Sequence, residues 1–195
     1  MQEISQPPAP GSAEHPSLAL AGSLNDLPGT RGFDDLADPE AATAWLAARD
    51  LISPDAVLYE LCRGRLVGLR AHLRALFAAR VSCEAPPAGA IQALNDALTS
   101  VPGARLLRHD PVAGFRREAD HPATQVVEHA MATIAEDAAS LLTGAEAPQL
   151  AECEAGSCQR FFLRTHARRQ WCSNRCGDRV RAARAYARKR VGSGV

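Results

Sequence analysis

Apolar residues recur every three or four positions over much of the chain, and this spacing predicts a mainly α-helical body. One such stretch runs from about residue 38 to 49, and a longer one from about 53 to 81. Each begins with a capping residue followed by proline, a pair that suits the first turn of a helix. Both segments are therefore expected to be helices that bury one face.

Two more helices and one hairpin are predicted further along the chain. Apolar residues mark a helix over about 91–98 and another from about 122 to 142, which stops at Gly144. Between these helices, residues 104–108 and 112–117 are strand-like runs on either side of an Asp-Pro pair. Their spacing favours one small antiparallel hairpin.

Composition divides the chain into a tail, a body and a small C-terminal module. Residues 1–16 are rich in proline, serine and alanine and lack the segments of a signal peptide, so a disordered tail is expected. The helical body is assigned to residues 17–144, a linker to 145–149 and the module to 150–191. No apolar run reaches the length of a membrane span, which favours a soluble, cytoplasmic protein.

Four cysteines in the C-terminal module are spaced for one metal ion: Cys153, Cys158, Cys172 and Cys176. Two close pairs, separated by thirteen residues that suffice for a short hairpin, are typical of a structural zinc site, and Zn²⁺ is the predicted cofactor. A set of disulfides would require an oxidising compartment, which nothing in the sequence supports. His166 lies between the pairs and is assigned to the surface, because four thiolates already complete the site.

The module is too small to fold on a hydrophobic core alone. Zinc is therefore expected to supply much of its folding free energy. A miniature core around the metal is expected from Phe161, Phe162 and Trp171. Cys62 and Cys83, in the body, are interpreted as ordinary thiols and not as metal ligands.

The chain is neutral overall, but its charge is divided between its two parts. From residue 151 onward there are eleven arginine and lysine residues against three acidic ones, a net charge of +8, and residues 1–150 carry −8. Such a division suggests a basic interaction module beside an acidic domain. The alternative is a solvated, arginine-rich helix without a partner, in a chain that is rich in arginine and alanine throughout.

A basic helix is predicted to follow the last cysteine. Over about residues 176–191, one narrow apolar face is expected to dock, with basic flanks on both sides. Arginine suits such flanks because its guanidinium pairs bidentately with phosphates and with guanine edges. The apolar face comprises Cys176, Val180, Ala183, Ala187 and Val191. The residues expected to contact nucleic acid are Arg175, Arg179, Arg181, Arg184, Arg188, Lys189 and Arg190.

The stretch WCSNRCGDRVRAARAYARKR resembles the CGNR-type zinc finger, a bacterial family named for its Cys-Gly-Asn-Arg signature. Here the signature reads CGDR at residues 176–179, with Asp in place of the family's Asn. The N-terminal part is similar to the family's ABATE domain through the Leu18–Leu20 run and the Trp45-Leu46 pair, although the aromatic-Asn-Thr run that follows in the family is replaced here. The resemblance implies a stress-responsive transcription regulator that binds DNA through the finger.

The expected fold class is mainly α. It comprises a helical N-terminal domain with one small β-hairpin, followed by a small treble-clef-like four-cysteine zinc finger that ends in a basic helix. The leading functional hypothesis is a transcription regulator that binds double-stranded DNA. A homodimer, because one short helix contacts few bases, and an unidentified small ligand in the N-terminal domain are further hypotheses.

Other functions are weighed against this hypothesis. A protein-interaction module would dock the finger on an acidic partner or on the chain's own acidic N-terminal domain. Oxidation of the zinc thiolates would make the finger a redox sensor. The sequence holds no nucleophile elbow, phosphate loop or other catalytic motif, so an enzyme is not expected.

Overall fold

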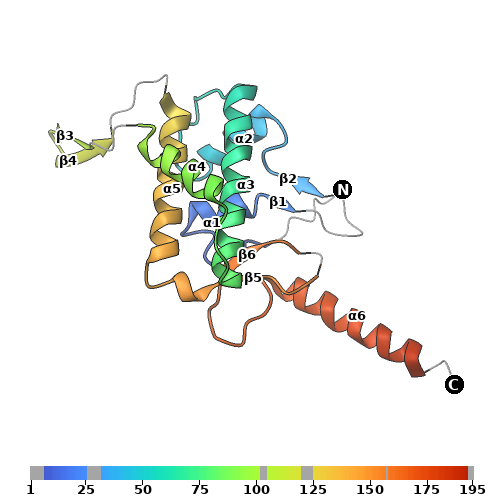
Figure 1. The fold of residues 1–195 in the computed structure, drawn as a ribbon. Coiled ribbons are helices and arrows are strands. Elements are labelled where there is room, and N and C mark those ends of the chain that lie inside the picture. The colour runs from blue at the N-terminus through green and yellow to red at the C-terminus, as the bar shows by residue number, and fades with distance from the viewer. Residues whose placement is uncertain (1–6, 26–31, 102–104, 120–124, 157, 193–195) are drawn as a thin grey trace.

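The computed structural model describes residues 7–25, 32–101, 105–119, 125–156 and 158–192 (Figure 1). The helices in this part of the chain are α1 (Pro16–Ala21), α2 (Pro39–Ala47), α3 (Glu60–Ser82), α4 (Ala88–Thr99), α5 (Val126–Thr143), the 3₁₀ helix η2 (Ala147–Gln149) and α6 (Asn174–Gly192). The strands form three antiparallel pairs: β1 (Leu24–Asn25) with β2 (Phe33–Asp34), β3 (Arg105–Asp110) with β4 (Gly114–Ala119), and β5 (Leu150–Glu152) with β6 (Phe161–Leu163). The predicted fold class, mainly α with one small hairpin before a four-cysteine module, is confirmed.

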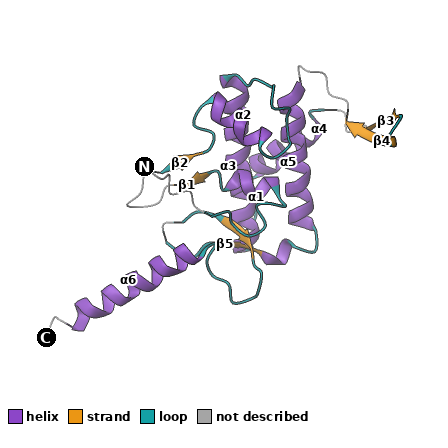
Figure 2. Ribbon diagram, turned by 180° about the vertical axis from the view of Figure 1, so that it is seen from behind, coloured by secondary structure: helices purple, strands orange, loops and turns teal. Residues whose placement is uncertain are grey.

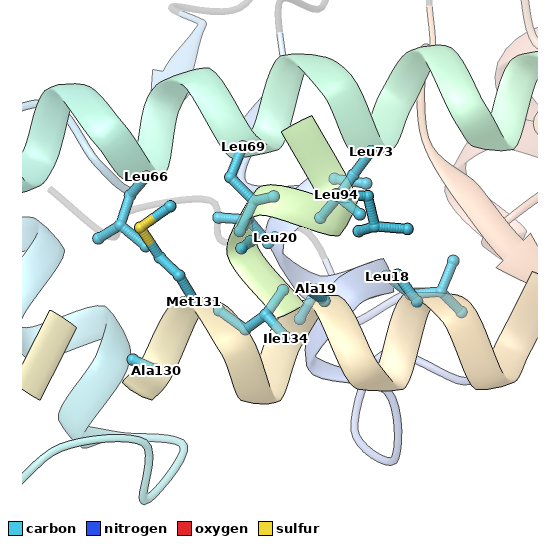
Figure 3. Close-up of a cluster of buried hydrophobic side chains, with 14 of the residues drawn as sticks. Leu18, Ala19, Leu20, Leu66, Leu69, Leu73, Leu94, Ala130, Met131 and Ile134 are labelled. Carbon is cyan, nitrogen blue, oxygen red and sulfur yellow. The ribbon is translucent and has the colours of Figure 1, made fainter. Parts of the chain in front are cut away.

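The core of the helical body lies between α3 and α5, with α1 and α4 beside them (Figure 3). Leu66, Leu69 and Leu73 follow one another at intervals of three and four residues and therefore share one face of α3. They belong to the same buried cluster as Ile134 of α5 and Leu20 of α1. Burial of each such side chain stabilises the fold by about 1.5–3 kcal/mol.

The short helix α1 is almost completely buried, and it was not predicted from the sequence. Its N-terminus is held by Asp137 of α5, whose carboxylate accepts hydrogen bonds from the Ser17 N–H at 2.9 Å and from the Ser17 hydroxyl. His15 contacts the same carboxylate through Nδ1, at 2.8 Å. A six-residue helix is unstable alone, so α1 exists because α5 caps it and the core surrounds it.

A partly buried ion pair fastens the β1–β2 sheet to α3. Arg70 is only 4 % exposed, and its guanidinium donates to both carboxylate oxygens of Asp34 and to the Ser23 hydroxyl. Burial alone would raise the pKa of Asp34, but the hydrogen bonds from Arg70 and the Leu36 N–H, together with the positive charge of Arg70, outweigh it and leave the pKa lowered. A lowered folded-state pKa means that this contribution to stability is present above the unfolded carboxyl's pKa and is lost as pH falls through the folded one.

Local predictions of helices and of the β3–β4 hairpin agree with the structure, with one exception in the helical body. The helix expected from residue 53 begins instead at Glu60. Residues 53–56 form a turn closed by a hydrogen bond from the Ala56 N–H to the Ser53 carbonyl, and Val57 is 73 % exposed. The predicted start of the last body helix, at residue 122, lies outside the described residues.

The β5–β6 hairpin forms a wall that separates the core of the helical body from a second, smaller hydrophobic cluster. Successive side chains of a strand point to opposite faces. Phe161 and Leu163 of β6 accordingly lie in the core of the helical body, whereas Phe162 lies in a second cluster with the four cysteines. The expected miniature core is thus right for Phe162 and Trp171 but wrong for Phe161, whose ring packs edge-on against Phe77 of α3, with centroids 5.7 Å apart.

Residues 7–15, which were expected to be disordered, contact the module. The Pro7 carbonyl accepts a hydrogen bond from the Arg160 guanidinium at 2.8 Å, and the Pro10 carbonyl accepts one from the Leu163 N–H at 2.9 Å. Gly11 has a φ of +86°, and a Cβ there would lie 2.8 Å from Leu163 Cγ, so glycine fits this position best. Composition failed here because these contacts are made with residues some 150 positions away.

The segment expected to be a linker is also structured. Residues 147–149 form the 3₁₀ helix η2, Ala147 is buried, and the Arg164 N–H donates to the Gln149 carbonyl at 2.8 Å. The module therefore continues directly from the helical body. Figure 2 shows α6 extending away from that body, at the opposite end of the molecule from the β3–β4 hairpin. None of the described helices has both the length and the apolar character needed to cross a membrane.

The wall position of Phe161 gives the first prediction. Phe161→Ala should lower the free energy of unfolding by about 3–5 kcal/mol, because it leaves a cavity where the two cores meet. Phe115→Ala is the matched control, since Phe115 lies on β4 and is 74 % exposed whereas Phe161 is 3 % exposed. Chemical denaturation of both zinc-loaded variants measures the difference. Equal stabilities would contradict a shared wall.

Candidate metal centre and basic helix

The four cysteines of the candidate metal centre come from two places, the loop of the β5–β6 hairpin and the start of α6. Cys153 and Cys158 lie in the loop between β5 and β6, where the Cys153 N–H donates to the Arg160 carbonyl and continues the ladder. Cys172 precedes α6, and Cys176 lies in its first turn. The hairpin thus encloses the first pair of cysteines, instead of lying between the two pairs as the spacing alone suggested.

The spacing of the sulfur atoms fits one zinc ion. All four Sγ atoms lie within 4.8 Å of one another, and the Cys158–Cys172 and Cys172–Cys176 separations are both 3.7 Å. A tetrahedral zinc ion with bonds of about 2.3 Å separates its sulfur ligands by about 3.8 Å. All four side chains are buried, and their thiols are free of disulfides.

The four thiols strongly influence one another's protonation. The hydrogen bond from Cys158 and that from Cys172 lower the pKa of Cys153 to about 7. The pKa of Cys158 and that of Cys172 are raised, in each case first by the hydrogen-bonded Cys153. Four thiolates cannot crowd together without a cation, so zinc binding displaces protons and supplies the charge that holds the cluster.

Neighbouring groups orient the sulfur atoms. The Cys172 N–H donates to Cys153 Sγ at 3.4 Å, and the Arg179 guanidinium lies 3.8 Å from Cys176 Sγ as a donor. Arg169 donates from Nε to the Trp171 carbonyl at 3.0 Å and from Nη2 to the Cys172 carbonyl at 3.2 Å. Such contacts to the ligands and their backbone fix the geometry of a metal site.

Gly177 allows Trp171 to pack against the base of α6. A Cβ at position 177 would lie 2.9 Å from Trp171 Cε3, closer than real contacts allow, and 3.1 Å from Arg181 Nη1, which is a tight contact. The next residue, Asp178, forms an exposed ion pair with Arg181 at 2.6 Å. Glycine after the fourth cysteine therefore has a steric cause, and Asp178 neutralises part of the positive charge of α6.

Most residues predicted to contact nucleic acid lie on the exposed surface of α6. Arg179 is the exception, because it is half-buried and directed to Cys176. The side chain of Arg190 lies outside the described part of the structure. The exposed ones are Arg175, Arg181, Arg184, Arg188 and Lys189.

The predicted apolar face of α6 does not dock over its whole length. Cys176 is buried and Val180 half-buried in the cysteine cluster, but Ala183 and Ala187 are exposed because the helix leaves the body after its second turn (Figure 1). The side chain of Val191 lies outside the described residues. Between residues 181 and 189 the side chains of α6 are accordingly exposed, except that of Ala185, which is half-buried.

Sequence reasoning also missed a second group of basic residues beside α6. His166, Arg168 and Arg169 lie in the loop from β6 to α6, and together with the base of α6 they line a pocket. His166 is exposed and stands outside the cysteine cluster, in agreement with its assignment to the surface. In the sequence, the density of basic residues between the two cysteine pairs was the signal that could have indicated this second basic group.

A helical body whose C-terminal hairpin carries a four-cysteine zinc centre, extended by an exposed basic helix, defines a zinc-finger protein. The chain matches the ABATE family model, described as "Putative stress-induced transcription regulator", over residues 14–145, and the CGNR zinc finger model over residues 149–189. The chain belongs to this family. A search of curated proteins finds no match. Zinc as the cofactor is thereby confirmed by both the family and the cysteine cluster.

The zinc centre gives the second prediction. The full chain should bind one zinc ion, and Cys172→Ser should abolish tight binding and lower the thermal midpoint, because the metal ties the hairpin to α6. Cys83→Ser is the matched control, since Cys83 is exposed and outside the cluster. Metal analysis after dialysis against a chelator measures retention. Full zinc occupancy of the Cys172 variant would contradict the assignment.

Proposed function

We propose that this protein is a transcription regulator that binds double-stranded DNA through α6. The observation that carries the proposal is the projection of α6 away from the body (Figure 2). Its first turn is fixed by the zinc centre, and four of its arginine side chains are exposed: Arg175, Arg181, Arg184 and Arg188. The family's description as a transcription regulator supports the same function.

The dimensions and charge of α6 suit the major groove of DNA. Its nineteen residues span about 28 Å, and a groove about 12 Å wide admits a helix. Arg181, Arg184 and Arg188 lie three and four residues apart and thus follow one flank of the helix. Guanidinium groups in such a row can pair with successive phosphates or with guanine edges.

Further parts of the proposal concern assembly, signal and location. A homodimer would place two such helices in successive grooves and so raise specificity. A response to stress or to a small ligand would act through the helical body, which we treat as non-catalytic. We place the protein in the cytoplasm and on DNA, where thiols stay reduced and free to bind zinc.

The protein-interaction alternative includes docking of the basic helix on the chain's own acidic domain. The structure gives this arrangement no support, because the finger contacts the body through the apolar residues of β6 while α6 points away (Figure 1). Docking on a separate acidic protein remains the competitor to DNA. Tests need the full chain, since removing residues 1–150 would expose Phe161 and Leu163.

The third prediction tests the function directly. Zinc-loaded full-length protein should bind a labelled duplex with an affinity that falls steeply with salt, with a log–log slope of several units. Arg184→Ala and Arg188→Ala should each weaken binding to every sequence and reduce the slope by about 1. Arg116→Ala is the control, because Arg116 is an exposed arginine on the hairpin at the opposite end of the molecule. Salt-independent or absent binding would remove the DNA proposal and favour an acidic protein partner.

The fourth prediction concerns the departure from the family signature. Asp178→Asn removes a negative charge and releases Arg181 from its ion pair, so DNA affinity should increase. The gain should be at most about fivefold, since an exposed ion pair contributes up to about 1 kcal/mol. Asp55→Asn, an equal change of charge in an exposed loop of the body, should have no effect on titrations at low salt. Weaker binding of Asp178→Asn would show that the carboxylate itself is needed.

A further inference from the structure

A pocket of ≈ 210 Å³ lies at the base of α6, beside the surface that we propose for DNA. Its walls come from the β6–α6 loop and from the first turns of the helix. The lining includes His166, Arg168, Arg169, Trp171, Asn174 and Arg181. Gly177 also lines it, and any side chain there would collide with the Trp171 ring.

The charge of this pocket is positive. Three arginines and no carboxylate line it. Arg169 already donates to the backbone carbonyls before α6, and Arg181 is paired with Asp178, so these two are held in place. Arg168 is exposed, and its guanidinium makes no hydrogen bond or ion pair with the described residues. The pocket thus presents a positive charge, that of Arg168, which forms no ion pair with the described residues.

The polar atoms of the pocket also favour a hydrogen-bond acceptor. Trp171 Nε1 is buried and has no partner among the described residues, and an indole N–H can only donate. Guanidinium groups likewise only donate. A ligand that pairs with the guanidinium groups of this pocket should therefore carry several acceptor oxygens and a negative charge, which is the chemistry of a phosphate group.

We propose that this pocket seats one phosphate of the DNA backbone, with Arg168 as its principal contact and Arg181 as the second. This inference rests on the proposed function and adds the β6–α6 loop to the DNA-binding surface. Phosphate contacts fix the position and orientation of a protein on DNA. A phosphate held at the base of α6 would set the depth and direction in which the rest of the helix enters the groove.

The test follows the Trp171 indole N–H resonance in zinc-loaded, full-length protein. Trp45→Phe identifies the signal, since the chain has only two tryptophans. Inorganic phosphate and a short duplex are titrated separately. We expect both to shift the resonance, and Arg168→Ala to abolish the shift and to reduce the salt slope of DNA binding by about 1.

Arg188→Ala is the matched control, because Arg188 is an exposed arginine on α6 that does not line the pocket. It should reduce the salt slope equally but leave the phosphate-induced shift intact. A shift with the duplex alone, lost in Arg168→Ala, would still support a backbone phosphate. A shift with inorganic phosphate alone would replace the backbone phosphate with a free anion and overturn the inference.

These experiments distinguish a failure of the pocket inference from a failure of the proposed function. If the duplex binds with a steep salt dependence but Arg168→Ala changes neither the slope nor the indole resonance, the pocket is not part of the DNA surface and the function stands. If neither the unmodified protein nor the Arg168→Ala variant binds the duplex at low salt, the proposed function fails, and with it the role of the pocket on DNA. Zinc content of each variant confirms that the finger is intact.

Discussion

The C-terminal zinc module depends on the two buried faces of the β5–β6 hairpin. A two-stranded hairpin is barely stable in water, and this one has only three residues in each strand. One face is covered by the helical body through Phe161 and Leu163, the other by Phe162 and the cysteine cluster. Zinc and the hydrophobic effect therefore stabilise the same few residues from opposite sides, and the loss of either weakens both.

This arrangement anchors the base of α6 to the hairpin and, through it, to the body. Its first turn carries Cys176, its base is packed against Trp171 beside Gly177, and η2 leaves no loose segment before β5. The residues near the N-terminus add a further clamp through Arg160 and Leu163. The direction in which the basic helix leaves the molecule is consequently set where its base meets the hairpin.

Features that depend on neighbours in sequence were predictable. The cysteine spacing predicted the metal site. The Asp-Pro pair at the start of α2 predicted that helix, and the strand-like runs predicted β3 and β4. Features that depend on distant partners were not. The helix α1 needs Asp137, the contact at Pro7 needs Arg160, and the face of Phe161 is decided by Phe77. The start of α3 was misplaced because Ser-Pro suits a turn as well as a helix.

The signature CGDR also separates structural from binding roles. Cys176 binds the metal, Gly177 makes room for Trp171, and Arg179 is turned back to the Cys176 sulfur. None of these three residues is directed toward solvent as a reader of bases would be. Asp178 is exposed, yet its charge opposes an approaching phosphate. If the protein binds DNA as proposed, recognition must come from residues outside the signature. The CGDR signature therefore describes how the finger is built more than what it binds.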